Sequence, residues 1–373
     1  MTNPFDYQRP VGPAVLIDRT EELDGLQRAA ADAVAIRLAA PRRYGKTTLL
    51  AAHVATMREA GHRAVIVDLS QVATVGDAAL RVARAFADLP GDPGRTFDRL
   101  LSRLGISLGV AGLTLRVSGR PATREPEQAR SILAELLELP RQLHQVDGGL
   151  TVVCLDEFQD LLTADLTLDG LVRSVTQHHG SAAAYVYAGS APSLMRALFS
   201  ERERPLFGQA RPIELPPLPA AEALEDILAI AEANEVNLDA GAVRRIVDLG
   251  AGHPQRTMLL AHHLFDAAAS DIAVDDAADL ALERALRETA DVHRTVWDSL
   301  ARSERAVVTA LADGLAPTGS HAAELHHVPR GTLQKALERL VAAEQHVASR
   351  EGRPVLVDPL LAVWLARRGQ ASA

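Results

Sequence analysis

Cysteine is almost absent from this 373-residue chain, which contains only Cys154. A single cysteine cannot form an internal disulfide, so the composition suits a reducing compartment and we expect a cytoplasmic protein. Long apolar runs are also missing. No run reaches the roughly 18 residues that a membrane-spanning helix needs, and the N-terminal stretch MTNPFDYQRP lacks the apolar core of a signal peptide. We therefore expect no contact with a membrane.

A basic excess is missing as well. The formal net charge is -9 and the sequence pI is about 5.8, which argues against a protein that coats a polyanion over its whole surface. Hydrophobic residues make up 47% of the chain, enough to bury a sizeable core. At this length the composition predicts a globular protein with two or three domains.

The most informative stretch is VAIRLAAPRRYGKTTLL, residues 34–50. Its apolar start predicts a buried strand from Val34 to Ala39, and the apolar spacing from Thr47 to Met57 predicts a helix. The loop between them carries the Gly-Lys-Thr signature of a phosphate-binding loop. Backbone amides at a helix N-terminus and around a tight glycine turn are suited to bind polyphosphate.

Individual residues of this loop have predicted roles. Lys46 is expected to reach the β- and γ-phosphates, and the Thr47 hydroxyl is expected to complete the coordination of Mg²⁺. Ala40 replaces the first glycine of the usual pattern, so we expect ordinary backbone angles there. The other residues expected to line the nucleotide site are Pro41, Arg42, Arg43, Tyr44, Gly45 and Thr48, although Thr48 also suits helix packing.

A second motif is LTVVCLDEFQD, residues 150–160, an apolar run that ends in two acids. A carboxylate at the end of a parallel strand stands beside a phosphate-binding loop, so Asp156 is the predicted magnesium residue. Glu157 is the candidate general base that activates water. A further strand, SAAAYVYAGS, ends at Ser190, which is a candidate sensor of the γ-phosphate or an ordinary helix cap.

Other signals leave alternatives open. Arg202, Arg204 and Arg211 are candidates for an arginine finger or for local phosphate contacts. The chain from Ala220 to Thr289 is helical in pattern with a break at residues 250–254. Adjacent histidines occur at 178/179, 262/263 and 326/327, but neighbours on a helix point about 100° apart and no acid or cysteine completes a set, so the pattern disfavours a metal site.

Residues 303–365 have the pattern of a winged helix-turn-helix, with three helices and an alternating hairpin. Arg330, Thr332, Lys335 and Arg339 are expected on its third helix. Residues 320–373 contain seven Lys/Arg against five Asp/Glu, an excess of about two that is weak for a DNA reader. Protein contact is equally compatible with this pattern.

The order of the motifs PRRYGKTTLL, VVCLDEFQDL, YVYAGSAPSLM, PLFGQARPIELPPLP and AGHPQRTMLLAHHL resembles the archaeal-type ATPase family, in the STAND branch of AAA+ P-loop ATPases. The resemblance implies an α/β fold with a parallel sheet of order 5-1-4-3-2, a helical lid and a C-terminal winged helix. It also implies that His253 and Pro254 contact the nucleotide and that Arg256 is a lid sensor. Gln209 departs from the arginine that relatives often carry after PLFG.

The expected domains are a P-loop ATPase core at residues 1–217, a helical lid at 218–290 and a winged helix-turn-helix at 291–373. We expect a slow ATPase, with ATP and Mg²⁺ as cofactors, that acts as a switch and couples its nucleotide state to a winged-helix domain that contacts protein or DNA. Two alternatives stay open: a DNA-bound regulatory or initiator-like ATPase, and a nucleotide-binding scaffold with little turnover. A homo-oligomer is compatible with either, because a ring or dimer multiplies modest contacts.

Overall fold

The computed structural model divides the chain into two compact units. It describes residues 3–9, 17–89, 116–117, 120–121, 126–270, 274–350 and 352–371. What we call the core unit contains residues 20–40 and 46–215. The C-terminal unit contains the N-terminal arm up to residue 19, the loop 41–45 and the chain from residue 216 onward. None of the described helices is long and apolar enough to span a membrane.

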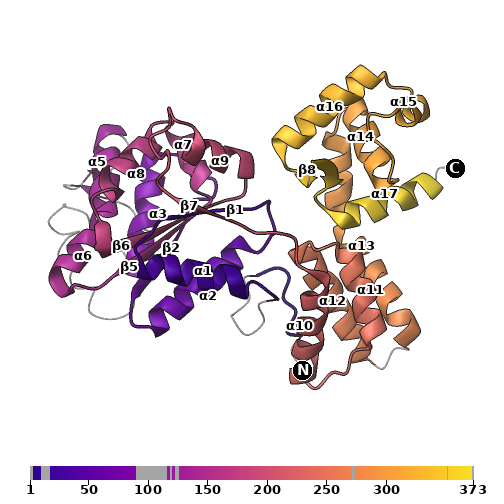
Figure 1. The fold of residues 1–373 in the computed structure, drawn as a ribbon, viewed down its shortest axis with the longest axis horizontal. Coiled ribbons are helices and arrows are strands. Elements are labelled where there is room, and N and C mark those ends of the chain that lie inside the picture. Colours follow the sequence, from indigo (N-terminus) through magenta and orange to yellow (C-terminus); the bar gives the residue numbers. More distant parts are fainter. Residues whose placement is uncertain are drawn as a thin grey trace. The chain divides into compact units, whose positions relative to one another are not determined.

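The core unit is built around a five-stranded parallel sheet (Figure 1). Its strands are β1 (Ile36–Ala39), β2 (Arg63–Asp68), β5 (Thr151–Asp156), β6 (Ala183–Gly189) and β7 (Arg211–Glu214). The spatial order is β2-β5-β6-β1-β7. When these five strands are numbered 1 to 5 along the chain and read from the β7 edge, the order is 5-1-4-3-2, so the predicted α/β fold and sheet order are confirmed. Every residue of β5 and β6 is buried, which explains their continuous apolar sequence.

Helices cover both faces of this sheet. Figure 1 shows α1 and α2 on one face and α3, α5 and α8 on the other. The helices of the core unit are α1 (Thr20–Ala31), α2 (Lys46–Glu59), α3 (Val75–Ala87), α5 (Pro126–Leu137), α6 (Leu139–Asp147), α7 (Leu161–Ala164), α8 (Leu168–Thr176) and α9 (Pro192–Ser200). Pro140 lies in the first turn of α6, where its missing N–H does not remove a helical hydrogen bond.

The register of the strands brings three strand ends together. Ala39, the last residue of β1, pairs with Gly189, the last residue of β6. On its other side β6 pairs with β5, with Tyr187 opposite Leu155. Parallel strands end at the same edge of a sheet, so Ala40, which follows β1 and donates to the Gly189 carbonyl oxygen at 3.3 Å, lies beside the residues that end β5 and β6.

The first part of the C-terminal unit is helical, as the sequence predicts. It contains α10 (Ala220–Ala233), α11 (Ala240–Gly250), α12 (Pro254–Ala268) and α13 (Val274–Ser299). The predicted break is confirmed at Ala251 and Gly252, which both have positive φ. A Cβ atom at Gly252 would approach the Leu218 carbonyl oxygen to 2.9 Å, so only glycine fits there. Phe5 of the N-terminal arm is fully buried in this helical core, edge-on to Phe265.

The rest of the unit contains three helices and a hairpin in the predicted order, followed by a last helix that the sequence analysis did not predict. These are α14 (Arg302–Ala312), α15 (Ser320–His326), α16 (Arg330–Ala343), the antiparallel pair β8 (Val347–Arg350) and β9 (Arg353–Leu356), and α17 (Pro359–Ala371). Helix α17 contributes Leu360 to the core of α10–α13 and Leu361 and Leu365 to the core of α14–α16. Helix α13 runs without a break through the expected boundary at residue 290, and the three-domain division stays a prediction.

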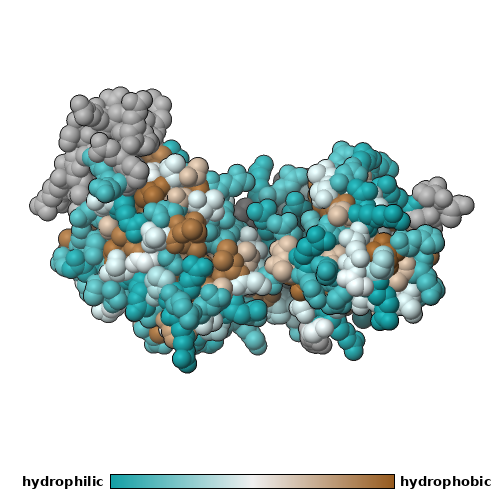
Figure 2. Space-filling model, turned by 90° about the horizontal axis from the view of Figure 1, so that it is seen from above, coloured by the Kyte–Doolittle hydropathy of each residue, from teal (hydrophilic) through white to brown (hydrophobic). Residues whose placement is uncertain are grey.

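Residues 105–117, GISLGVAGLTLRV, could form a small hairpin or part of an insertion, and all but the last two lie outside the described residues. Those last two residues form β3 (Arg116–Val117), which pairs with β4 (Arg120–Pro121). The face of the molecule drawn in Figure 2 is mainly hydrophilic, and apolar residues occur on it in smaller groups. The large apolar side chains are accordingly concentrated in the buried cores.

Candidate nucleotide-binding site

The phosphate-binding loop has an unusual backbone. Arg43 and Gly45 both have positive φ, 66° and 83°. Glycine adopts this conformation at no steric cost, whereas at arginine it is a strained conformation of the kind that is kept at functional sites. Ala40 has an ordinary negative φ, as expected for an alanine at the first position of the motif. The loop therefore turns sharply just before α2, and its amides lie at the helix N-terminus.

Lys46 is the first residue of α2 and is only 4% exposed. Its ammonium group donates a hydrogen bond of 2.9 Å to the carbonyl oxygen of Ala40, at the start of the same loop. The amine is thus held across the loop rather than extended into solvent. Thr48, two residues further along α2, is half buried, while the side chains of Arg42 and Arg43 reach solvent, that of Arg43 with partial desolvation.

Thr47 and Asp156 meet at the end of β5. The Thr47 hydroxyl donates a hydrogen bond of 2.7 Å to Oδ2 of Asp156. Burial raises the pKa of Asp156 above its ordinary value, and the Thr47 hydrogen bond and the charge of Lys46 only partly oppose this. A buried carboxylate next to a neutral hydroxyl is a donor pair that suits Mg²⁺, because a cation offsets the desolvation of the carboxylate.

Glu157 follows Asp156 in a left-handed conformation, with φ of 52°. Its Oε2 accepts hydrogen bonds from the backbone N–H of Ser190 at 3.0 Å and from Nε2 of Gln159 at 2.6 Å. The carboxylate is thereby fixed beside the end of β6. A Cβ atom at Gly189 would come within 2.4 Å of Gln159 Oε1, so the glycine leaves room for this glutamine.

Gln159 is a functional candidate that the sequence analysis missed. It is buried, and its amide also donates to Oδ1 of Asp160 at 3.1 Å. The available signal was its place two residues after the candidate base, in the same DEFQ motif. The short 3-10 helix Phe158–Asp160 turns the chain so that the Gln159 side chain reaches the carboxylate of Glu157.

His253 and Pro254 form the start of α12 in the C-terminal unit. The His253 ring accepts a hydrogen bond from the backbone N–H of Arg256 and so caps the helix. Burial lowers the pKa of His253 to about 4, which keeps the ring neutral at physiological pH. The ring also lies edge-on to Tyr44 of the phosphate-binding loop, with centroids 5.1 Å apart. Arg350 of β8 donates a hydrogen bond to the hydroxyl of this tyrosine.

Arg256, the predicted lid sensor, is 2% exposed and is bound to another side chain. Its guanidinium group pairs with both carboxylate oxygens of Asp358, with Nε at 2.9 Å from Oδ1. His293 lies 3.1 Å from Oδ2 of the same carboxylate. Burial alone would raise the pKa of Asp358, but the hydrogen bonds from His293 and Arg256 bring it far below its ordinary range. This cluster joins α12, α13 and the start of α17.

The expected site residues thus fall into two groups. The core unit brings together Lys46, Thr47, Asp156, Glu157 and Ser190. The C-terminal unit brings Tyr44 and the rest of the loop 41–45 together with His253 and Arg256. Among the arginine-finger candidates, Arg204 lies 3.8 Å from both Asp169 and Glu201, and Arg202 and Arg211 are exposed. These positions do not select one of the three.

Several solved structures share this fold over nearly their whole length. A Walker-type ATPase of Pyrococcus abyssi has a TM-score of 0.69 at 18% identity, covering 97% of this chain and 99% of that one. The ORC2 protein of Aeropyrum pernix, solved as ADPNP–ADP complexes, has a TM-score of 0.61 at 16% identity, with 99% and 98% covered. The ORC1 protein of Aeropyrum pernix, solved in complex with DNA, has a TM-score of 0.50 at 18% identity, with 96% and 95% covered.

These likenesses establish the fold. The chain has the fold of AAA+ P-loop ATPases. No protein-family model matches the chain, and no curated protein matches its sequence.

Proposed function

We propose that the chain is a Mg²⁺-dependent ATPase of the STAND branch that turns over slowly and works as a switch. The observation that carries this proposal is the 2.7 Å hydrogen bond from Thr47 to Asp156, with Glu157 next in sequence. This arrangement supplies a hydroxyl and a carboxylate for Mg²⁺ and a second carboxylate for water. Lys46 and the loop amides would bind the phosphates.

The test is ATP binding and phosphate release by the purified chain with and without Mg²⁺. We expect the Asp156→Asn protein to lose most of the Mg²⁺-dependent turnover, because the amide removes the negative charge that favours the cation. Asp32→Asn, at an exposed position of the core unit, is the matched control. If the wild-type chain binds no nucleotide, or if Asp156→Asn responds to Mg²⁺ as the wild type does, the proposal fails.

The switch would act through the C-terminal unit. We propose that residues 218–290 form a lid and residues 291–373 a winged helix that contacts a protein partner. The Arg256–Asp358 pair supports this coupling, because it joins α12 to the segment before α17. Arg43 is also electrostatically coupled to this pair, and burial followed by the charge of Arg256 lowers its pKa. A bound phosphate would therefore compete with Asp358 for Arg256.

The Asp358→Asn substitution is expected to lower the free energy of unfolding of the C-terminal unit by about 3–5 kcal/mol, because it leaves Arg256 buried without its counter-ion. A bound nucleotide is expected to restore part of this stability, so ATP should stabilise the variant more than the wild type. Urea unfolding followed by fluorescence measures both effects. The fluorescence comes from the chain's two tryptophans, Trp297 and Trp364, which both lie in this unit. The ring centroids of Trp364 and His293 are 6.0 Å apart.

Asp279→Asn is the control for this experiment. Asp279 pairs with Arg245 at the surface, where both side chains are more than half exposed, so its loss is expected to cost less than about 1 kcal/mol. An equal loss of stability in the two variants would remove the special role of Asp358. Equal stabilisation of the wild type and Asp358→Asn by ATP would show that the Arg256–Asp358 pair is not coupled to nucleotide binding.

DNA binding by the proposed winged helix is the second candidate function. It is favoured by the exposed face of α16, which carries Arg330, Lys335 and Arg339 opposite the buried Leu333, Ala336 and Leu340. The ORC1 structure with the same fold contains DNA.

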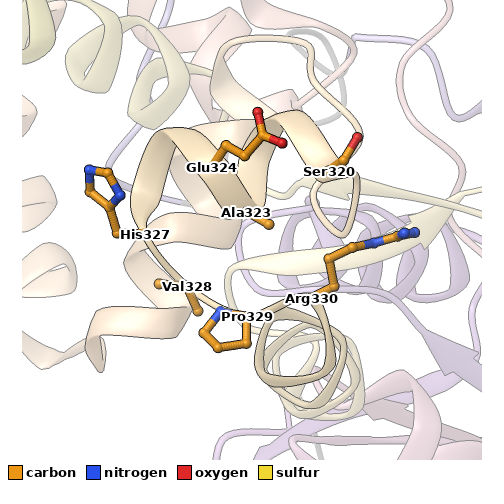
Figure 3. Close-up of a pocket in the computed structure, with 7 residues that line it drawn as sticks. All are labelled: Ser320, Ala323, Glu324, His327, Val328, Pro329 and Arg330. Carbon is orange, nitrogen blue, oxygen red and sulfur yellow. The ribbon is translucent and has the colours of Figure 1, made fainter.

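Other contacts of this surface argue against DNA binding. Arg330 donates to the Thr318 carbonyl oxygen at 3.0 Å, and Arg339 lies 3.8 Å from Glu304. The turn before α16 borders a hollow of about 370 Å³ that also exposes Glu324 (Figure 3).

A salt titration of duplex DNA separates the two candidates. If α16 binds the DNA backbone, affinity falls steeply with salt, and the slope shrinks by about one unit for each cation removed in Arg330→Ala/Lys335→Ala. Arg245→Ala, an exposed arginine on α11, is the control. Protein contact predicts no such slope. Absence of duplex binding at low salt, or binding that both substitutions leave unchanged, assigns this surface to protein contact.

A further inference from the structure

A cluster of histidines and acids lies on α12, away from the residues that serve the nucleotide. His262, His263 and Asp266 are half buried, and each offers one ligand atom within 4.8 Å of the others. The expectation that no acid completes a set at this histidine pair is wrong, because Asp266 follows His262 by one helical turn. Neighbouring side chains on a helix start in different directions, but the rings of His262 and His263 still come close, with centroids 5.4 Å apart.

Hydrogen bonding identifies the protonated nitrogen of His262. Its Nδ1 lies 2.9 Å from the backbone carbonyl oxygen of Phe5. A carbonyl oxygen can only accept a hydrogen bond, so Nδ1 carries the proton. In a neutral ring Nε2 then has a free lone pair and is an acceptor. This Nε2 lies 3.5 Å from Oδ2 of Asp266, which is also an acceptor. Two acceptors that face each other are stabilised by a proton, a bridging water or a metal ion between them.

His263 is held in a matching way. Its Nε2 lies 3.2 Å from Oε2 of Glu288 on α13 and donates to it, which leaves Nδ1 as the basic nitrogen. Tyr7 of the N-terminal arm donates to the other oxygen of Glu288 at 2.5 Å and fixes this carboxylate. Histidines that bind metals have this arrangement, in which the second ring nitrogen donates to a carbonyl or a carboxylate and sets the tautomer.

We propose that His262, His263 and Asp266 form a binding site for a transition-metal dication, and that Zn²⁺ suits it best. Two imidazole nitrogens and one carboxylate are a typical zinc donor set, whereas Mg²⁺ and Ca²⁺ prefer oxygen ligands alone. Two donors about 2.1 Å from a tetrahedral ion lie about 3.4 Å apart, close to the 3.5 Å between His262 and Asp266. Water is the expected fourth ligand. The bound ion would fasten the N-terminal arm to α12 through Phe5 and Tyr7.

The site is tested by titrating the full, tag-free chain with Zn²⁺ in a calorimeter. We expect one equivalent to bind in the wild type, and this binding to be lost in His262→Gln and in Asp266→Asn. Glu288→Gln is expected to weaken it by about 10- to 100-fold, because the neutral amide lacks the charge that raises the basicity of the His263 ring. His178→Gln, at an exposed histidine of the core unit, should bind Zn²⁺ as the wild type does.

Cobalt substitution supplies a second measurement that does not depend on the folding of a variant. Co²⁺ bound by two nitrogens and one carboxylate is expected to give the visible absorption of a tetrahedral ion in the wild type. The proposal is overturned if the wild type binds no stoichiometric Zn²⁺, which would leave a proton or a bridging water between His262 and Asp266. Equal Zn²⁺ affinity in wild type, His262→Gln and Asp266→Asn, or an octahedral Co²⁺ spectrum, overturns it as well.

Discussion

Replacement of Glu157 by glutamine is expected to slow ATP hydrolysis by about 100-fold or more while ATP affinity stays near that of the wild type. The amide is nearly isosteric with the carboxylate and can still accept the hydrogen bond from the Ser190 backbone N–H. It cannot take a proton from water, so the chemical step loses its base. Binding is spared, because the phosphates are assigned to Lys46 and the loop amides.

Phosphate release and equilibrium nucleotide binding measure the two effects separately. Glu135→Gln, an exposed glutamate on α5, is the control and is expected to match the wild type in both. Wild-type turnover in Glu157→Gln would move the base to another residue. A large loss of ATP affinity in the same variant would instead make Glu157 a binding residue.

The Lys46→Ala substitution is expected to abolish ATP binding and leave the fold intact. We assign the ammonium group the role of binding the phosphates, and its hydrogen bond to the Ala40 carbonyl oxygen connects it to the start of the same loop. The chain has only one other lysine, Lys335, which lies on the exposed face of α16. Lys335→Ala is therefore a closely matched control.

Binding of a fluorescent ATP analogue and thermal unfolding test this prediction together. We expect no measurable binding in Lys46→Ala and an unfolding temperature close to that of the wild type. Unchanged nucleotide affinity would contradict the assignment of the loop. Lost binding together with a collapsed unfolding temperature would show that Lys46 serves the fold.

The sequence predicted those parts of the site that depend on short stretches of chain. The phosphate-binding loop directly follows β1, Asp156 is the last residue of β5 and Glu157 comes next. Buried parallel strands of this kind are recognisable as continuous apolar runs. Their relative positions then follow from the sheet register. The sheet order itself came from the resemblance of the motifs, because apolar runs do not reveal which strands are neighbours.

The contacts that the sequence did not reveal join residues far apart in the chain. Arg256 and Asp358 are 102 positions apart, and no local pattern marks either of them as the partner of the other. His262 gains its orienting partner from the backbone of Phe5, whose side chain gives no hint of that role. Gln159 is near Glu157 in sequence, but only the conformation of the intervening turn shows that its amide reaches the carboxylate.

The burial of Phe5 against Phe265 has a consequence for synthesis on the ribosome. Phe5 is made before α12, and the helix that buries it is completed only after more than 250 further residues have been added. The strands and helices between residues 20 and 215 can pack with one another before that point. The N-terminal arm therefore stays without its packing partner until α12 has been made, and both C-terminal cores are closed only after α17 has followed. We therefore expect premature termination within α17 to leave a folded sheet attached to an open helical half.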